Sequence, residues 1–269
     1  MRQYCRIMRN GLAIFLIGLS VGVSSAASTP TEVTDFGSNP GQLRMFRYIP
    51  DGLRGPAPLV AVLHGCKQTA APYAEASGWM RLADRWGFAL LLPEQRPANN
   101  DSLCFNWFRP EDAARDRGEA LSIRQMIGRM QADHPIDPQK IYVAGLSAGG
   151  AMTAALLATY PEVFAGGAII AGVPYGCAGG VPSALWCQWL GSDQEPGEWG
   201  DAVHRAAGPS GPRRQRVSIW QGDADWAVDP DNAQELLEQW TQAMGIDQIP
   251  DREDTVKGFA HRVFKDAAG

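Results

Sequence analysis

Residues 140–160 read Lys-Ile-Tyr-Val-Ala-Gly-Leu-Ser-Ala-Gly-Gly-Ala-Met-Thr-Ala-Ala-Leu-Leu-Ala-Thr-Tyr, and this stretch decides the fold. It begins with a short apolar run, residues 141–144, that is typical of a buried strand. It ends with an Ala/Leu-rich segment, residues 151–160, that predicts a helix ended by Pro161. The chain is therefore expected to form a strand, a tight turn and a helix in direct succession.

The turn between them, Gly145-Leu146-Ser147-Ala148-Gly149, has the pattern G-x-S-x-G. In a strand-to-helix elbow of this kind the serine backbone is strained and its hydroxyl is exposed at the top of the sheet. Gly145 and Gly149 fit positions where strand and helix pass too closely for a Cβ. The following helix N-terminus favours negative charge on a reacting oxygen. The motif predicts Ser147 as a nucleophile, and a plain tight turn is the alternative.

Length and composition suit a globular α/β protein. At 269 residues the chain is expected to form one domain, or at most two small ones. Hydrophobic residues make up 45% of the chain and charged residues 20%, which is enough apolar material for a core. The formal charge of -5 argues against nucleic acid or an anionic membrane as the main partner.

The N-terminus has the pattern of a secretory signal peptide. Arg2, Arg6 and Arg9 precede an apolar run at residues 12–23, and small residues follow it up to Ala26. The run is too short to span a bilayer, which disfavours the alternative of a membrane anchor. We expect residues 1–26 to be removed, leaving residues 27–269 as a secreted or periplasmic protein.

Cysteine usage agrees with an oxidising compartment. Once Cys5 has left with the signal peptide, Cys66, Cys104, Cys177 and Cys187 remain. Four cysteines allow three pairings, and the sequence does not choose between them. Our working hypothesis pairs Cys66 with Cys104 and Cys177 with Cys187. The chain has no C-x-x-C or H-E-x-x-H spacing, so we expect neither a metal nor another cofactor.

Strands and helices alternate along the chain. Besides the run at 141–144, apolar or alternating runs predict strands at residues 43–48 (an edge strand), 59–63, 88–92, 167–171, 217–221 and, in part, 261–264. Helical patterns occupy residues 73–86, 119–130 and 232–244, and a short helix is expected at 202–206 within the irregular stretch 172–212. This order predicts the α/β class and the α/β-hydrolase fold, with a mostly parallel sheet covered by helices on both faces.

An acid that could support Ser147 follows the predicted strand 217–221. Asp225 lies just past this strand, at the sheet edge where Ser147 is also expected. Asp223 competes with it, but Asp225 is farther beyond the strand and fits the pattern Gly-x-x-Asp-x-x-Val that hydrolases use there. A solvated turn is the alternative. A calcium loop is excluded because its sixth position would be Val228 instead of glycine.

The segment His64-Gly65-Cys66 follows the predicted strand 59–63, where hydrolases place an oxyanion donor. We expect the donors to be the backbone N–H groups of Cys66 and Ala148, each typically worth about 10²–10³ in rate. His64 is not expected to be the base, since the chain order of the triad in this fold is serine, acid, histidine. Its ring is expected to support the loop, and a purely structural glycine turn is the alternative.

Several motifs in one order resemble the poly(3-hydroxybutyrate) depolymerase-like esterases, which are close to feruloyl and acetylxylan esterases. They are the segments 63–69, 104–108, 145–150, 173–178 and 218–222. The resemblance implies a secreted serine esterase acting on hydroxyalkanoate oligomers or polymers, or on acyl and feruloyl esters. It supports Ser147, Asp225 and the Cys66 amide in their roles, and it implies that Trp107 faces the substrate. A core aromatic is the alternative for Trp107.

The sequence departs from this family at its catalytic histidine. In the family that residue follows one further strand, in a Gly-rich segment beyond a stretch similar to residues 261–266. None of His64, His134, His204 and His261 occupies the matching position. His261 is expected to be a solvent-facing strand residue. We therefore expect a truncated chain that lacks the last strand and the histidine loop and has weak activity. An inactive binding protein on a hydrolase fold is a further alternative.

Overall fold

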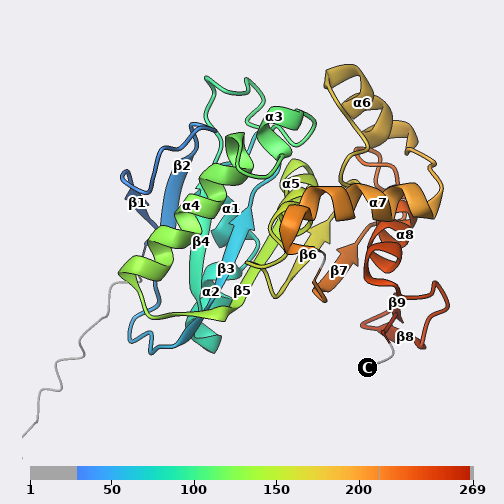
Figure 1. The fold of residues 1–269 in the computed structure, drawn as a ribbon. Coiled ribbons are helices and arrows are strands. Elements are labelled where there is room, and N and C mark those ends of the chain that lie inside the picture. The colour runs from blue at the N-terminus through green and yellow to red at the C-terminus, as the bar shows by residue number, and fades with distance from the viewer. Residues whose placement is uncertain (1–28, 212, 267–269) are drawn as a thin grey trace, which may run out of the picture.

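The computed structural model describes residues 29–211 and 213–266, so the predicted signal peptide lies outside the described residues. A seven-stranded sheet has the order β1-β2-β4-β3-β5-β6-β7 (Figure 1). Its strands are β1 (Thr31–Val33), β2 (Arg44–Tyr48), β3 (Ala57–Leu63), β4 (Ala89–Glu94), β5 (Ile136–Leu146), β6 (Gly166–Ile170) and β7 (Arg216–Trp220). The pairs β1–β2 and β2–β4 are antiparallel, and the other pairs are parallel.

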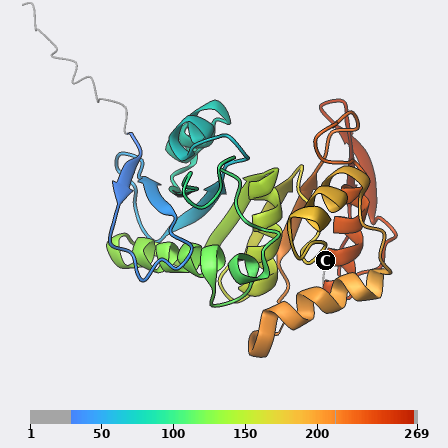
Figure 2. The ribbon, with the colours of Figure 1, turned by 90° about the horizontal axis from the view of Figure 1, so that it is seen from above.

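Helices cover both faces of this sheet because side chains of a strand alternate between faces. Leu59, Ala61 and Leu63 of β3 belong to a core cluster with α4 (Gly118–Asp133) and α5 (Ala148–Thr159), whereas Val60 and Val62 pack with α1 (Ala70–Ala76) and α2 (Trp79–Trp86). Figure 2 shows α1 and α2 on one side of the sheet, and α4 with α7 on the other. The predicted α/β-hydrolase fold class, with a mostly parallel sheet between helices, is thus confirmed.

The remaining elements lie in the second half of the chain, apart from the short α3 (Pro110–Ala113). They are α6 (Val181–Leu190), α7 (Pro196–Ala207), the 3₁₀ turn η1 (Gly208–Ser210), α8 (Asn232–Met244), β8 (Arg252–Val256) and β9 (Phe259–Val263). Helices α7 and α8 pack on one another and extend the α4–α5 layer of the core. Within the described residues, no helix combines the length and the hydrophobicity needed to cross a membrane.

Two predictions about the first half of the chain were wrong. The strand at 43–48 is not at the edge, because β1 pairs outside it. Only one of the three residues of β1 is buried, so this strand carries almost no periodic signal. The helix expected at 73–86 is two helices separated at Gly78, whose φ of 82° is left-handed and interrupts helical geometry. The second helix ends at Trp86, and the predicted stop, Gly87, is its C-cap.

Two further corrections concern the second half. The stretch 172–212 contains two full helices, α6 and α7, where one short helix at 202–206 was expected. The strand expected at 261–264 forms as β9, but it pairs only with β8, in a separate two-stranded antiparallel sheet. His261 lies in this hairpin, as a partly exposed strand residue, and its Nδ1 lies 2.6 Å from Asp254 Oδ1.

Candidate active site

Ser147 lies at a sharp turn between β5 and α5. Its backbone has φ 56° and ψ -120°, a conformation that residues other than glycine rarely adopt and that typically costs about 1–3 kcal/mol. Neighbouring backbone holds it from both sides: Ser147 N donates to Ile170 O at 2.9 Å, and Ala151 N donates to Ser147 O at 2.9 Å. Ser147 remains partly exposed, so the strained turn presents a hydroxyl at the surface.

Glycines make this turn possible, as the sequence predicted. A Cβ added to Gly145 would lie 2.2 Å from Gly149 O. A Cβ added to Gly149 would lie 2.4 Å from Leu63 O and 2.6 Å from His64 O. The end of β5, the start of α5 and the end of β3 are therefore in direct backbone contact around the candidate nucleophile.

The segment after β3 lies directly against the elbow. A Cβ built on Gly65 would approach Ser147 Cβ to 3.5 Å. Within the described part of the chain, neither Cys66 N nor Ala148 N donates a hydrogen bond. Uncommitted N–H groups beside a nucleophile are the donors that a developing oxyanion requires. The geometry thus brings the two predicted donors close to Ser147 and leaves both available.

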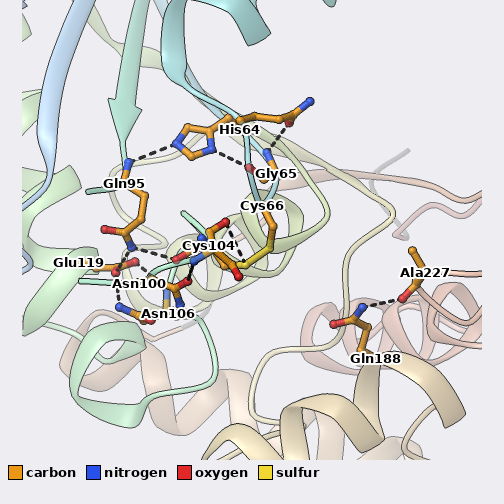
Figure 3. Close-up of a disulfide and its surroundings, with 12 residues drawn as sticks. His64, Gly65, Cys66, Gln95, Asn100, Cys104, Asn106, Glu119, Gln188 and Ala227 are labelled. Carbon is orange, nitrogen blue, oxygen red and sulfur yellow. Dashed lines mark hydrogen bonds between the residues drawn. A yellow bond between two sulfur atoms is a disulfide. The ribbon is translucent and has the colours of Figure 1, made fainter. Parts of the chain in front are cut away.

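His64 supports this loop, as expected. Its ring is fully buried, Nδ1 donates to Gly65 O at 2.8 Å, and Nε2 accepts from Gln95 N at 3.2 Å (Figure 3). The ring also packs against Phe105, with 4.9 Å between centroids. Burial lowers the pKa of His64, so the imidazole is a neutral structural link between the loop and the end of β4.

The structure contains both hypothesised disulfides. Cys66 is bonded to Cys104 and Cys177 to Cys187, with S–S distances of 2.02 and 2.03 Å. The first of them fastens the candidate oxyanion loop to the segment after β4. A hydrogen bond from Lys67 N to Ser102 O, at 2.7 Å, joins the same two segments.

A buried polar network next to Cys104 was not predicted from the sequence. The Glu119 carboxylate accepts from Gln95 Nε2 at 2.6 Å, from Asn106 Nδ2 at 2.8 Å and from Asn106 N at 2.9 Å. Gln95 Nε2 also donates to Cys104 O at 3.0 Å. Figure 3 shows these side chains gathered on one side of the disulfide. Burial raises the pKa of Glu119 to about 8, although the hydrogen bonds from Asn106 and Gln95 act in the opposite direction.

Asp225 emerges at the same edge of the sheet as Ser147. The register Leu146–Ile170–Trp220 aligns the ends of β5, β6 and β7, so the segments that follow β5 and β7 leave the sheet at the same level. Parallel strands lie about 4.8 Å apart, which separates these two segments by roughly 10 Å at the sheet.

Hydrogen bonds fix the Asp225 carboxylate. Its Oδ1 accepts from Ala227 N at 2.9 Å and from Val228 N at 3.0 Å, and its Oδ2 accepts from Gln221 Nε2 at 3.1 Å. By contrast, Asp223 is exposed and accepts no hydrogen bond from another described residue. The geometry therefore favours Asp225 over its competitor as the oriented carboxylate.

A small apolar cluster joins the Asp225 loop to the elbow. Val228 is buried with Ala151, in the first turn of α5, and with Cys187. Trp107 packs against this cluster and against the main core, and it is only partly buried. Trp107 therefore lies beside the site, in contact with core residues; its role towards a substrate stays a prediction.

The side chains of three of the four histidines have other hydrogen-bond partners. His204 Nε2 lies 2.9 Å from Ala243 O, His261 contacts Asp254, and the Nε2 of His134 is buried without a hydrogen bond to a described residue. In the part of the chain that the structure describes, no histidine hydrogen-bonds Ser147 or Asp225.

Comparison with known proteins shows that the chain is similar to esterases. A family model described as "Esterase PHB depolymerase" matches residues 44–254. Poly(3-hydroxyalkanoate) depolymerase C of Paucimonas lemoignei is 51% identical over 247 residues, which are 91% of this chain and 59% of that protein. Feruloyl esterase B of Thermothelomyces thermophilus is 35% identical over 229 residues, covering 82% of this chain and 77% of that one. The solved acetyl xylan esterase from Aspergillus awamori superposes with a TM-score of 0.82 at 26% identity, over 88% of this chain and 89% of that one.

Proposed function

Since this chain belongs to the Esterase PHB depolymerase family, we propose that it is a serine ester hydrolase acting on hydroxyalkanoate polyesters or their oligomers. The observation that carries the proposal is the strained, partly exposed Ser147 beside the free amides of Cys66 and Ala148. The chain spans 59% of the length of the Paucimonas depolymerase, so substrate and activity are proposed for the residues present here.

In the proposed reaction Ser147 Oγ attacks the carbonyl carbon of the ester. The oxygen of the tetrahedral intermediate takes up negative charge, and the Cys66 and Ala148 amides donate to it, with the N-terminus of α5 behind them. The bond to the leaving alcohol then breaks and leaves an acyl group on Ser147. Water attacks this acyl group, releases the acid and restores the hydroxyl.

The serine proton needs a base during attack, and the alcohol needs that proton on departure. Asp225, fixed by its hydrogen bonds from Gln221, Ala227 and Val228, would orient such a base. No histidine of the described residues hydrogen-bonds Ser147 or Asp225, so we assign the base to none of the four.

The test compares ester hydrolysis by the parent protein, Ser147→Ala and the matched variant Ser38→Ala. Ser38 is exposed in the segment after β1, which lies four strands away from β5 in the sheet, so its loss should leave turnover unchanged. Hydrolysis of a short-chain p-nitrophenyl ester should fall to background only in Ser147→Ala. Equal turnover in the Ser147→Ala and parent proteins would refute the assignment of the nucleophile.

A second candidate is an esterase that releases feruloyl or acetyl groups from plant polysaccharide. The similarity to feruloyl esterase B and to the acetyl xylan esterase fold favours it. We rank it second because the depolymerase is similar over more of the chain and at higher identity. Parallel assays with hydroxybutyrate oligomers and with feruloyl and acetyl sugar esters should show faster release from the oligomers. Binding of these compounds without release by a folded protein would favour the inactive binding protein.

We further infer that residues 27–269 form one esterase domain. We also infer that the protein works outside the cytoplasm. The two disulfides support this location, since such bonds persist in oxidising compartments. Expression with the native N-terminus should deliver oxidised protein, lacking residues 1–26, to the periplasm or medium. Retention of the full chain in the cytoplasm would contradict it.

A further inference from the structure

Helix α6 presents an unusual surface. Val181, Leu185, Trp186, Trp189 and Leu190 are each 40–64% exposed, and the helix contains no charged residue. At 3.6 residues per turn these side chains cover about half of its circumference. We call them the α6 apolar face. In Figure 1 the helix stands out from the body of the protein, on the side towards which the parallel strands point.

The opposite side of α6 is fastened to the candidate active site. Cys187 is buried and bonded to Cys177. Gln188 Nε2 donates to Ala227 O at 2.6 Å, and Asp229 N donates to Gln188 O at 2.8 Å. These contacts bracket the loop that holds Asp225. A surface bound to α6 would therefore be held at a fixed position relative to the site.

The area of the α6 apolar face limits what it can bind. Aromatic side chains bury about 150–250 Å² each, and Trp186 and Trp189 are 64% and 56% exposed. Together with the three smaller, partly exposed aliphatic side chains, the face offers roughly 400–500 Å² in total. That lies in the range of about 300–600 Å² typical of the largest functional patch on a monomer. It falls well below the roughly 800 Å² per partner of a stable protein interface. A second copy of this chain is therefore a poor fit as the occupant.

The charges near α6 further limit the class of partner that the α6 apolar face can bind. The sequence from 177 to 204 contains no lysine or arginine, whereas Asp193, Glu195, Glu198 and Asp201 follow α6 closely. Helices that lie on anionic membranes carry Lys and Arg on their polar side. The absence of cations disfavours anionic phospholipid, nucleic acid and acidic peptides. The surface suits an uncharged, extended apolar solid.

We propose that the α6 apolar face adsorbs the protein to the surface of a water-insoluble, uncharged polyester particle. The identity of the solid rests on the proposed esterase function, but adsorption itself requires no turnover. Exposed tryptophans lose little rotamer freedom on contact and remove a large apolar area from water. The fixed link to the Asp225 loop then holds the polymer surface next to Ser147.

The experiment measures adsorption and turnover separately. In a Ser147→Ala background, which leaves the particles intact, depletion from suspensions of poly(3-hydroxybutyrate) gives the binding affinity. Trp186→Gln combined with Trp189→Gln should weaken adsorption at least about tenfold, because roughly 100 Å² of apolar contact is lost per ring. Trp86→Gln is the matched control, because Trp86 is 65% exposed at the end of α2. It lies just before β4 begins, at the edge of the sheet opposite to the strand ends that carry Ser147 and Asp225. It should bind like its parent.

With Ser147 present, the double variant should hydrolyse a soluble p-nitrophenyl ester like its parent and degrade particles more slowly. Unchanged adsorption in the double variant, or an equal loss in Trp86→Gln, would overturn the proposal. The proposal would also be overturned by a concentration-dependent dimer of the parent that the double variant no longer forms. Binding of the parent to neutral phosphatidylcholine vesicles as strong as its binding to the polyester would overturn it as well. Adsorption through α6 without any ester turnover would support this proposal and refute the proposed function instead.

Discussion

Gly149 offers the most direct test of the geometry around Ser147. The substitution Gly149→Ala would place a Cβ 2.4 Å from Leu63 O and 2.6 Å from His64 O. Both oxygens belong to the backbone at the end of β3, so no side chain can rotate away. Because carbon and oxygen need more than 3 Å, the start of α5 and the end of β3 must separate by nearly 1 Å.

Both stability and turnover should respond. Overpacking of a tight core typically costs about 1–3 kcal/mol, and the upper end applies where backbone must move. At roughly 2–4 °C per kcal/mol for a domain of this size, Tm should fall by about 6–12 °C. The same shift moves the Cys66 amide relative to Ser147, and a misplacement of about 1 Å can cost about 10² in rate. We expect kcat for p-nitrophenyl ester hydrolysis to fall about 100-fold.

Gly197→Ala is the matched control. Gly197 lies in α7, and an added Cβ there has no neighbour within 4 Å. Alanine is the better helix former by up to about 1 kcal/mol, so this variant should be as stable as its parent or slightly more stable, with unchanged turnover. Thermal unfolding by circular dichroism and initial rates check both variants. A Gly149→Ala protein with the Tm and kcat of its parent would show that β3 and α5 do not meet as described.

The other predictions concern the supports of the site and the core. Replacing Cys66 and Cys104 by alanine opens a cross-link across 38 residues and should lower the free energy of unfolding by about 4 kcal/mol in urea titrations; an unchanged midpoint would argue against the cross-link. Burial raises the pKa of Glu119 to about 8 from 4.5, so the folded state holds this proton more tightly and the free energy of unfolding should decrease as pH rises from 4.5 to 8. Glu119→Gln should lack that part of the slope between pH 5 and pH 8, and equal slopes would contradict the assignment. Trp199→Phe removes the indole N–H that donates to Glu235 at 2.6 Å, and it should cost about 1–3 kcal/mol in thermal unfolding; a smaller loss would mean that the carboxylate finds another donor.

The elbow was predictable because all of its signals are local. The apolar run, the glycine-flanked Ser147 and the Ala/Leu-rich segment follow one another directly, and each specifies its own backbone conformation. Helix α8 was predicted with its observed bounds for the same reason. The position of Asp225 was predictable once β5 and β7 were taken as parallel strands of one sheet, since parallel strands end at the same edge.

Other elements depend on partners far away in the sequence. Strand β1 is defined by its pairing with β2, and Gln95, Asn106 and Glu119 become a network only when the loop after β4 folds over α4. Their residue types give no periodic pattern. A glutamate at the start of a helix reads as a solvated residue, whereas Glu119 is fully buried.

Helix α6 was missed for a different reason, which bears on its role. Sequence periodicity identifies helices by an apolar stripe that faces the core. In α6 the buried side carries small residues such as Ala184 and Cys187, while tryptophan and leucine side chains face outward. The helix therefore inverts the usual pattern and gives no amphipathic signal.

The same inversion explains why the helix needs a covalent link. An apolar face turned to solvent contributes nothing to folding, so α6 depends on Cys177–Cys187 and on Gln188 for its position. The candidate oxyanion loop is held in a similar way, because Cys66–Cys104 fastens a segment that no strand pairing fixes. Ser147 is positioned by the sheet, through the hydrogen bond from its N–H to Ile170 O. The two segments beside Ser147 are therefore held by cross-links, whereas the candidate nucleophile itself is held by regular structure.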